Sequence, residues 1–79
     1  MSREDIYEKL TEIFRDVFDD ESIEISDGTT AADIDGWYSL THITLLATVE
    51  DEFDIKFGMK EVQGLANVGE LVDLIARAV

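Results

Sequence analysis

The stretch DIDGWYSLTHITLLATVEDEFDI, residues 33–55, determines how this chain is expected to fold. It opens as an acidic, turn-rich loop and becomes regularly apolar just after Ser39. Apolar residues at spacings of three and four predict an α-helix whose buried face contains Leu40, Ile43, Leu46, Ala47, Val49 and Phe53. Hydroxyl and acidic residues are expected on the water-facing side: Thr41, Thr44, Thr48, Asp51 and Glu52. Ser39 stands where loop and helix join, beside the positive end of the helix dipole.

The rest of the chain predicts further amphipathic helices. A first helix is expected over about residues 3–17, where Ser2 provides a cap and apolar residues keep a helical period. A short helix or single turns are expected over 59–63, and a last helix follows the capping pattern Asn67-Val68-Gly69-Glu70. Residues 1–79 are therefore expected to form a single all-α domain, a small antiparallel four-helix bundle with three main helices, one short helix and a long first loop.

The connection of residues 19–38 is long for a compact domain, and such loops are more often functional than not. Ile23 and Ile25 alternate with polar residues, which predicts a short extended piece with both isoleucines packed beneath it. Other apolar residues of the loop are expected to tether it to the helices: Ala31, Ala32, Ile34 and Trp37.

The sequence Asp33-x-Asp35-Gly36 invites comparison with a calcium-binding loop. An EF-hand of this register needs an acid or amide at Ala31 and a glutamate at His42, and the chain has neither. No specific metal site is therefore predicted, and only weak binding of divalent cations stays open.

A formal charge of -13 argues against nucleic acids and anionic membranes as partners, since both would repel this surface, and it predicts partners with basic patches. Residues 19–39 carry seven acids and no base, which concentrates the negative field around Ser39, although such a run is usually only a solvated face. The absence of cysteine excludes disulfides, thiolate metal sites and cysteine nucleophiles. Without a leader or a long apolar run, a cytoplasmic location is expected.

His42 follows Ser39 at a spacing that suggests a Ser–His catalytic pair. The surrounding residues do not resemble a nucleophile elbow, and no pattern indicates an oxyanion hole or a bound metal. The chain is therefore predicted not to be an enzyme, with His42 an exposed helix residue.

Two motifs of the central stretch resemble the prosthetic-group site of acyl carrier proteins. One is Gly36-Trp37-Tyr38-Ser39-Leu40, and the other is the helix end Val49-Glu50-Asp51-Glu52-Phe53-Asp54-Ile55. The resemblance continues without gaps through about twenty residues and extends loosely over the chain through length, acidity and helix order. It implies the carrier-protein bundle, with 4′-phosphopantetheine attached to Ser39 and acyl groups held on its thiol as thioesters.

The resemblance also implies partners. A phosphopantetheinyl transferase would modify Ser39, and fatty-acid or polyketide-type biosynthetic enzymes with basic patches would load and use the carrier, which is expected to be a monomer. Partner recognition is expected at Tyr38, Leu40, Thr44, Asp51 and Glu52. Tyr38 and Thr44 depart from the family pattern, because many members have an acid at both places. This departure suggests a specialised carrier with its own set of partners.

Three alternatives stay open from the sequence. Ser39 could simply cap its helix, in a module that is acidic, binds partners and is never modified. The chain could instead be an aminoacyl or peptidyl carrier of a nonribosomal pathway. Finally, the small residues Ala47, Val62 and Ala66 could leave space for an acyl chain between the helices or could be ordinary core residues.

Overall fold

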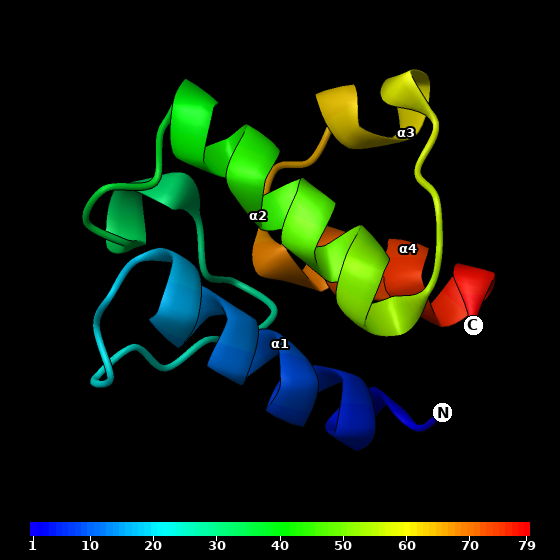
Figure 1. Ribbon diagram of the computed structural model, residues 1–79, viewed down its shortest axis with the longest axis horizontal. Helices are drawn as coiled ribbons and strands as arrows, with labels where there is room; N and C mark the ends of the chain where they lie inside the picture. Colours follow the sequence, from blue (N-terminus) through cyan, green and yellow to red (C-terminus); the bar gives the residue numbers. More distant parts are fainter.

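Four α-helices and one short 3-10 helix form the computed structural model, which describes residues 1–79 apart from the side chain of Met59. In chain order they are α1 (Arg3–Val17), η1 (Ala31–Asp33), α2 (Ser39–Phe53), α3 (Met59–Gln63) and α4 (Val68–Ala78), as Figure 1 shows. The predicted all-α bundle, with one short helix and a long first loop, is confirmed. The predicted first helix has the observed bounds, and the 3-10 turn inside the loop was not predicted.

The caps predicted for α1 and α4 are both present. The Ser2 Oγ accepts a hydrogen bond from the backbone N–H of Asp5 at 3.1 Å. The Asn67 Oδ1 accepts from the N–H of Glu70 at 2.9 Å, while the Glu70 carboxylate accepts from the N–H of Ala66 at 3.2 Å. The Glu70 side chain thus bonds one residue before the cap, where a standard capping box would use the cap residue itself.

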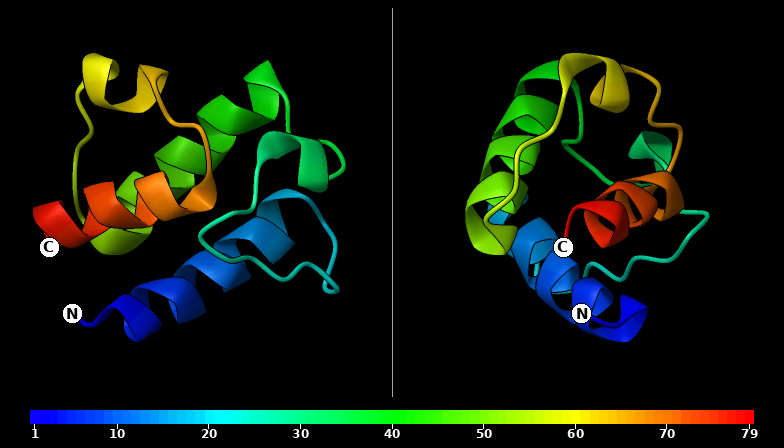
Figure 2. Two further views of the ribbon diagram at one scale, coloured as in Figure 1. Left: turned by 180° about the vertical axis from the view of Figure 1, so that it is seen from behind. Right: turned by 90° about the vertical axis from the view of Figure 1, so that its right-hand side faces the viewer.

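The core lies where α1 packs against both α2 and α4 (Figure 2). Nine large side chains are almost completely buried there: Ile6, Leu10, Phe14, Leu45, Val49, Val68, Leu71, Val72 and Ile75. Both termini of the chain lie near the same end of the bundle (Figure 1). None of the helices among the described residues is long and apolar enough to cross a membrane.

The buried face of α2 differs from the prediction. Leu45, Val49 and Phe53 enter the core at spacings of four, whereas Leu40 is 71% exposed, Ile43 is 66% exposed and Ala47 is also exposed. The predicted burial of these last three residues is therefore wrong. Apolar residues occur on two opposite sides of α2, so periodicity alone could not select the side that α1 covers.

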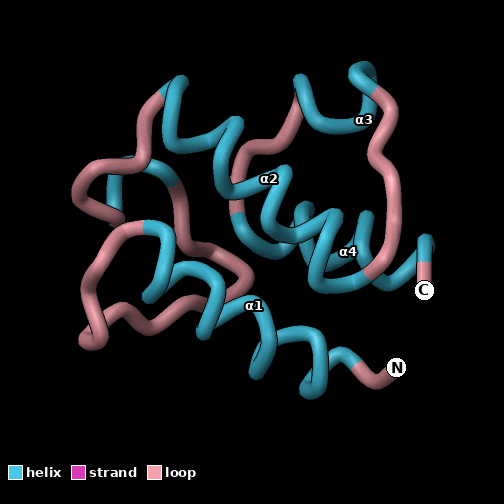
Figure 3. The backbone as a smooth tube through the Cα atoms, viewed as in Figure 1, coloured by secondary structure: helices cyan, strands magenta, loops and turns pink.

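The long first loop follows the bundle surface as irregular backbone and η1 (Figure 3). Ile23 and Ile34 are buried and Ile25 is half-buried, which confirms the prediction that the loop packs through its isoleucines. The predicted tethers Ala31 and Ala32 are exposed instead.

Asp27 fastens this loop to the start of α4. Its carbonyl oxygen accepts from the Gly69 N–H at 3.0 Å, and a side chain at Gly69 would bring a Cβ within 2.9 Å of that oxygen. Arg3 bridges the Asp27 carboxylate at 2.9 Å and Asp73 at 2.7 Å, and Tyr7 donates its hydroxyl to Asp27. The hydrogen bond from Tyr7, followed by that from Arg3, lowers the pKa of Asp27.

Candidate functional site

Ser39 is the first residue of α2, and the residue before it, Tyr38, occupies the N-cap position. Ser39 is exposed, and its hydroxyl has no hydrogen-bond partner among the described atoms. The interpretation of Ser39 as the helix cap is therefore wrong. Because Ser39 follows the cap, its hydroxyl is not used for capping and lies on the surface at the positive end of the helix dipole.

The helix start is closed by Thr41 instead. The Thr41 Oγ1 accepts from the backbone N–H of Tyr38 at 2.9 Å. The same hydroxyl lies 2.6 Å from the Gly36 carbonyl oxygen and 3.0 Å from the Tyr38 carbonyl oxygen, and donates its proton to these acceptors. Gly36 has a φ of 86°, in the left-handed region that favours glycine, so the turn before the helix is built for this residue.

Trp37 anchors the end of the loop against α1. Its ring meets Phe14 edge-on at a centroid distance of 5.2 Å and lies 6.2 Å from Phe18. On its other side the Trp37 Nε1–H donates to His42 Nδ1 at 3.0 Å. The residue directly before Tyr38 and Ser39 is thus fixed both to α1 and to α2.

His42 is half-buried, so its predicted exposure is wrong. Burial lowers the pKa of the imidazole and favours its neutral form, which can accept the Trp37 hydrogen bond at Nδ1. No hydrogen bond joins His42 to Ser39 among the described atoms. His42 therefore supports the shape of the site and does not form a catalytic pair with the serine.

A cavity of about 280 Å³ opens beside Ser39. Three segments line it: Ala31 and Trp37 from the loop, Tyr38, Ser39 and His42 from the start of α2, and Leu65, Ala66, Asn67 and Leu71 from the start of α4 and the residues before it. Of the small residues expected to leave space for a chain, Ala66 lines this cavity, whereas Ala47 and Val62 do not.

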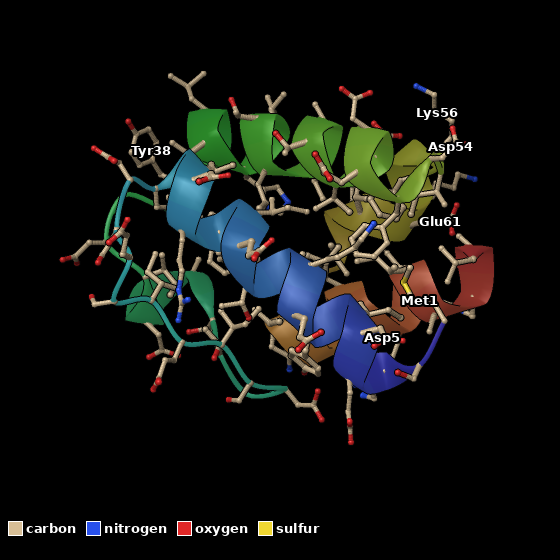
Figure 4. All side chains as sticks on the ribbon, turned by 60° about the horizontal axis from the view of Figure 1, so that its bottom comes forward. Met1, Asp5, Tyr38, Asp54, Lys56 and Glu61 are labelled. Atoms are coloured by element: carbon tan, nitrogen blue, oxygen red, sulfur yellow. The ribbon has the colours of Figure 1, made fainter. Side chains whose placement is uncertain are left out.

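The surface around Ser39 is apolar at one end of α2 and acidic at the other. Tyr38 is 61% exposed and lies with Leu40 and Ile43 at the start of the helix, whose first turn contains no acid. Exposed acids follow at the far end, where Figure 4 shows Asp54 at the opposite end of α2 from Tyr38. All five residues expected to recognise partners are exposed: Tyr38, Leu40, Thr44, Asp51 and Glu52. Ile43 was missed as a surface residue because it shares the periodicity of a buried face.

Comparison with known proteins identifies the class. The family model described as the phosphopantetheine attachment site matches residues 8–75, so the chain belongs to this family. A solution NMR structure of the holo acyl carrier protein from Geobacter metallireducens superposes with a TM-score of 0.86 and 47% sequence identity, covering 91% of this chain and 83% of that chain. The protein is accordingly an acyl carrier protein-like phosphopantetheine carrier, and a carrier of this family is not itself a catalyst.

Proposed function

We propose that residues 1–79 act as an acyl carrier domain with 4′-phosphopantetheine esterified to Ser39. When bound, this group supplies a thiol that holds acyl groups as thioesters. The observation that supports the assignment is the exposed Ser39 hydroxyl, which is free of hydrogen bonds to described atoms and stands beside a cavity. A carrier of this kind delivers acyl groups to fatty-acid or polyketide-type biosynthetic enzymes.

The other three serines of the chain have hydroxyls that are already engaged. The Ser2 hydroxyl caps α1, and the Ser22 hydroxyl lies 2.6 Å from the Asp20 carboxylate that accepts its proton. The Ser26 hydroxyl lies 3.3 Å from the Thr29 hydroxyl, within hydrogen-bond distance. Ser39 therefore has the hydroxyl best suited to become a nucleophile.

The start of α2 also suits an attached phosphate. The first N–H groups of a helix have no partner inside it, and the helix dipole favours negative charge there. Because the first turn of α2 contains no acidic residue, no carboxylate of that turn competes with a phosphodiester on Ser39. The residues present thus fit the prosthetic group that the family carries.

The exposed side of α2 is the surface that we expect partners to contact. Apolar contacts would form close to Ser39, at Tyr38 and Leu40, and polar or ionic contacts further along, at Thr44, Asp51 and Glu52. Basic patches on a transferase or a synthase complement a chain of charge -13 and would speed association. A monomeric state and a cytoplasmic location remain predictions.

The acyl reading is favoured over its alternatives. The structural relative named above, 47% identical in sequence, is an acyl carrier protein, which favours an acyl group over an aminoacyl or peptidyl group. An unmodified module would have no need of an exposed serine hydroxyl left out of the capping network.

Intact-mass spectrometry tests the proposal. Incubation with coenzyme A, magnesium and a broad-range phosphopantetheinyl transferase is expected to add one phosphopantetheine unit to the wild-type chain. The Ser39→Ala variant is expected to stay unmodified, whereas Ser22→Ala is a matched control that should be modified normally. An unchanged wild-type mass, or modification of Ser39→Ala, would contradict the proposal.

A further inference from the structure

Two hydroxyls compete to define the start of α2. Serine is among the best N-cap residues, whereas a tyrosine side chain supplies no oxygen near the first N–H groups. Capping preference alone would therefore begin the helix after Ser39, with the Ser39 Oγ accepting a backbone N–H. The structure instead begins the helix after Tyr38, where the His42 N–H donates to the Tyr38 carbonyl oxygen at 2.8 Å.

The Thr41 hydroxyl accounts for this choice. It accepts the Tyr38 N–H at 2.9 Å and donates toward the carbonyl oxygens of Gly36 and Tyr38. The two hydrogen bonds with the Tyr38 N–H and the Tyr38 carbonyl oxygen depend on Tyr38 being the cap and Thr41 the third residue of the helix. Each would be lost if the helix began one residue later.

Trp37 limits any shift of the helix start to the residues that follow it. Because Trp37 packs against Phe14 and bonds to His42, the loop cannot follow a movement of the helix start. Only the conformations of Tyr38 and Ser39 can then vary. The Thr41 hydroxyl therefore decides whether the helix begins after Tyr38 or after Ser39.

We propose that Thr41 is a positioning residue for the modification of Ser39. The inference rests on the function proposed above. In that reaction the Ser39 oxygen forms a bond to the pantetheine-bearing phosphorus of coenzyme A, the pyrophosphate P–O bond breaks, and adenosine 3′,5′-bisphosphate leaves. The serine proton passes to a base of the transferase. A Ser39 oxygen that accepts a backbone N–H has an occupied lone pair and is turned toward the helix, so Thr41 keeps the nucleophile available by fixing the start at Tyr38.

Kinetics with a phosphopantetheinyl transferase test the proposal. Thr41→Val keeps the shape of the side chain and removes its hydroxyl, and kcat is expected to fall about fivefold, the factor that corresponds to one capping interaction of about 1 kcal/mol. KM should stay unchanged because Leu40 and Ile43 still present the docking surface. Thr41→Ser should restore kcat. The matched control is Thr48→Val, which removes a hydroxyl that bonds the Thr44 carbonyl oxygen at 2.9 Å further along α2 and should leave kcat unchanged.

Backbone NMR supplies a readout that needs no transferase. The ¹³Cα shift of Ser39 should be helical in the wild type and in Thr41→Ser, and should move toward the extended value in Thr41→Val. If Thr41→Val does not fold, Thr41→Ala removes the same hydroxyl with a better helix former.

Three results would overturn the role of Thr41: wild-type kcat in the hydroxyl-free variants, a Thr41→Ser as slow as Thr41→Val, or an unmoved Ser39 shift. Failure to modify even the wild type would overturn the proposed function instead. The NMR comparison would still show whether Thr41 determines where the helix begins.

Discussion

The starts of α1 and α2 each contain a serine, and the two serines are used differently. Ser2 lies just before α1 and caps it by accepting the Asp5 N–H. Ser39 is the first residue of α2, one position after the cap, and its hydroxyl bonds to no described atom. A shift of one residue relative to the helix start thus separates a hydroxyl that stabilises the fold from one that is free for chemistry.

The apolar residues of the first two turns differ in the same way. Ile6 of α1 is completely buried, whereas Ile43 of α2 is 66% exposed. The start of α1 serves the core, whereas the start of α2 leaves the side chains next to Ser39 on the surface, where we propose that partner proteins bind. Four experiments test how far this difference extends.

The largest effect is expected from shortening the two isoleucines. Ile6→Ala should lower the free energy of unfolding by about 2–5 kcal/mol, because it leaves a cavity in a packed core. Ile43→Ala should change it by less than about 0.5 kcal/mol, as exposed substitutions usually do. Urea unfolding followed by circular dichroism measures both. Equal losses would show that Ile43 is buried in solution and that the surface assigned to α2 is wrong.

The two serines should respond oppositely to alanine. Ser2→Ala should lower the free energy of unfolding by about 1 kcal/mol through loss of the cap, and should leave modification by the transferase unchanged. Ser39→Ala should hardly change stability, because its hydroxyl holds no described group. Thermal melts of the unmodified proteins provide the comparison. A destabilised Ser39→Ala would mean that Ser39 caps α2 after all.

Replacing Tyr38 by aspartate should make the start of α2 more like that of α1. An aspartate at the N-cap can accept a backbone N–H of the first turn, which the Tyr38 side chain does not do, and it also interacts favourably with the dipole. A gain of about 1 kcal/mol in the free energy of unfolding is therefore expected. Modification by a general transferase should become faster if that enzyme reads charge at this position. Tyr38→Asn is the control, since it caps without charge. A slower Tyr38→Asp would identify Tyr38 itself as a recognition element.

The smallest effect is expected from the titration of His42, which lies about one helical turn after Ser39. Its folded-state pKa is lowered by burial, so between its ordinary pKa of about 6.5 and the lower folded value the unfolded chain binds more protons. Stability should therefore fall for the wild type relative to His42→Gln as the pH drops below about 6.5. Glutamine can still accept the Trp37 hydrogen bond but does not titrate. Comparing the two proteins at each pH removes the contribution of their shared carboxylates to the pH dependence of stability. Parallel pH profiles would contradict the burial of His42.

Much of the fold was predictable because its signals are local. The cap at Ser2, the pattern at Asn67–Glu70 and the apolar period over 3–17 each depend on residues within one or two helical turns, and all are present in the structure. The same holds for Ser39 as a residue at a loop–helix junction. The motif around Ser39 was enough to indicate the family that the family model then confirmed.

The sequence by itself determined the helices, the acidic surface and the identity of the serine that is proposed to be modified, since each follows from neighbouring residues. Tertiary structure alone decided which side of α2 is buried, because Leu45 and Leu40 are equally apolar and only the position of α1 distinguishes them. It also decided that Thr41 and not Ser39 closes the helix start. That choice depends on where the loop holds Gly36 and Trp37, and the loop is fixed by contacts with Phe14 and Phe18, far away in the chain.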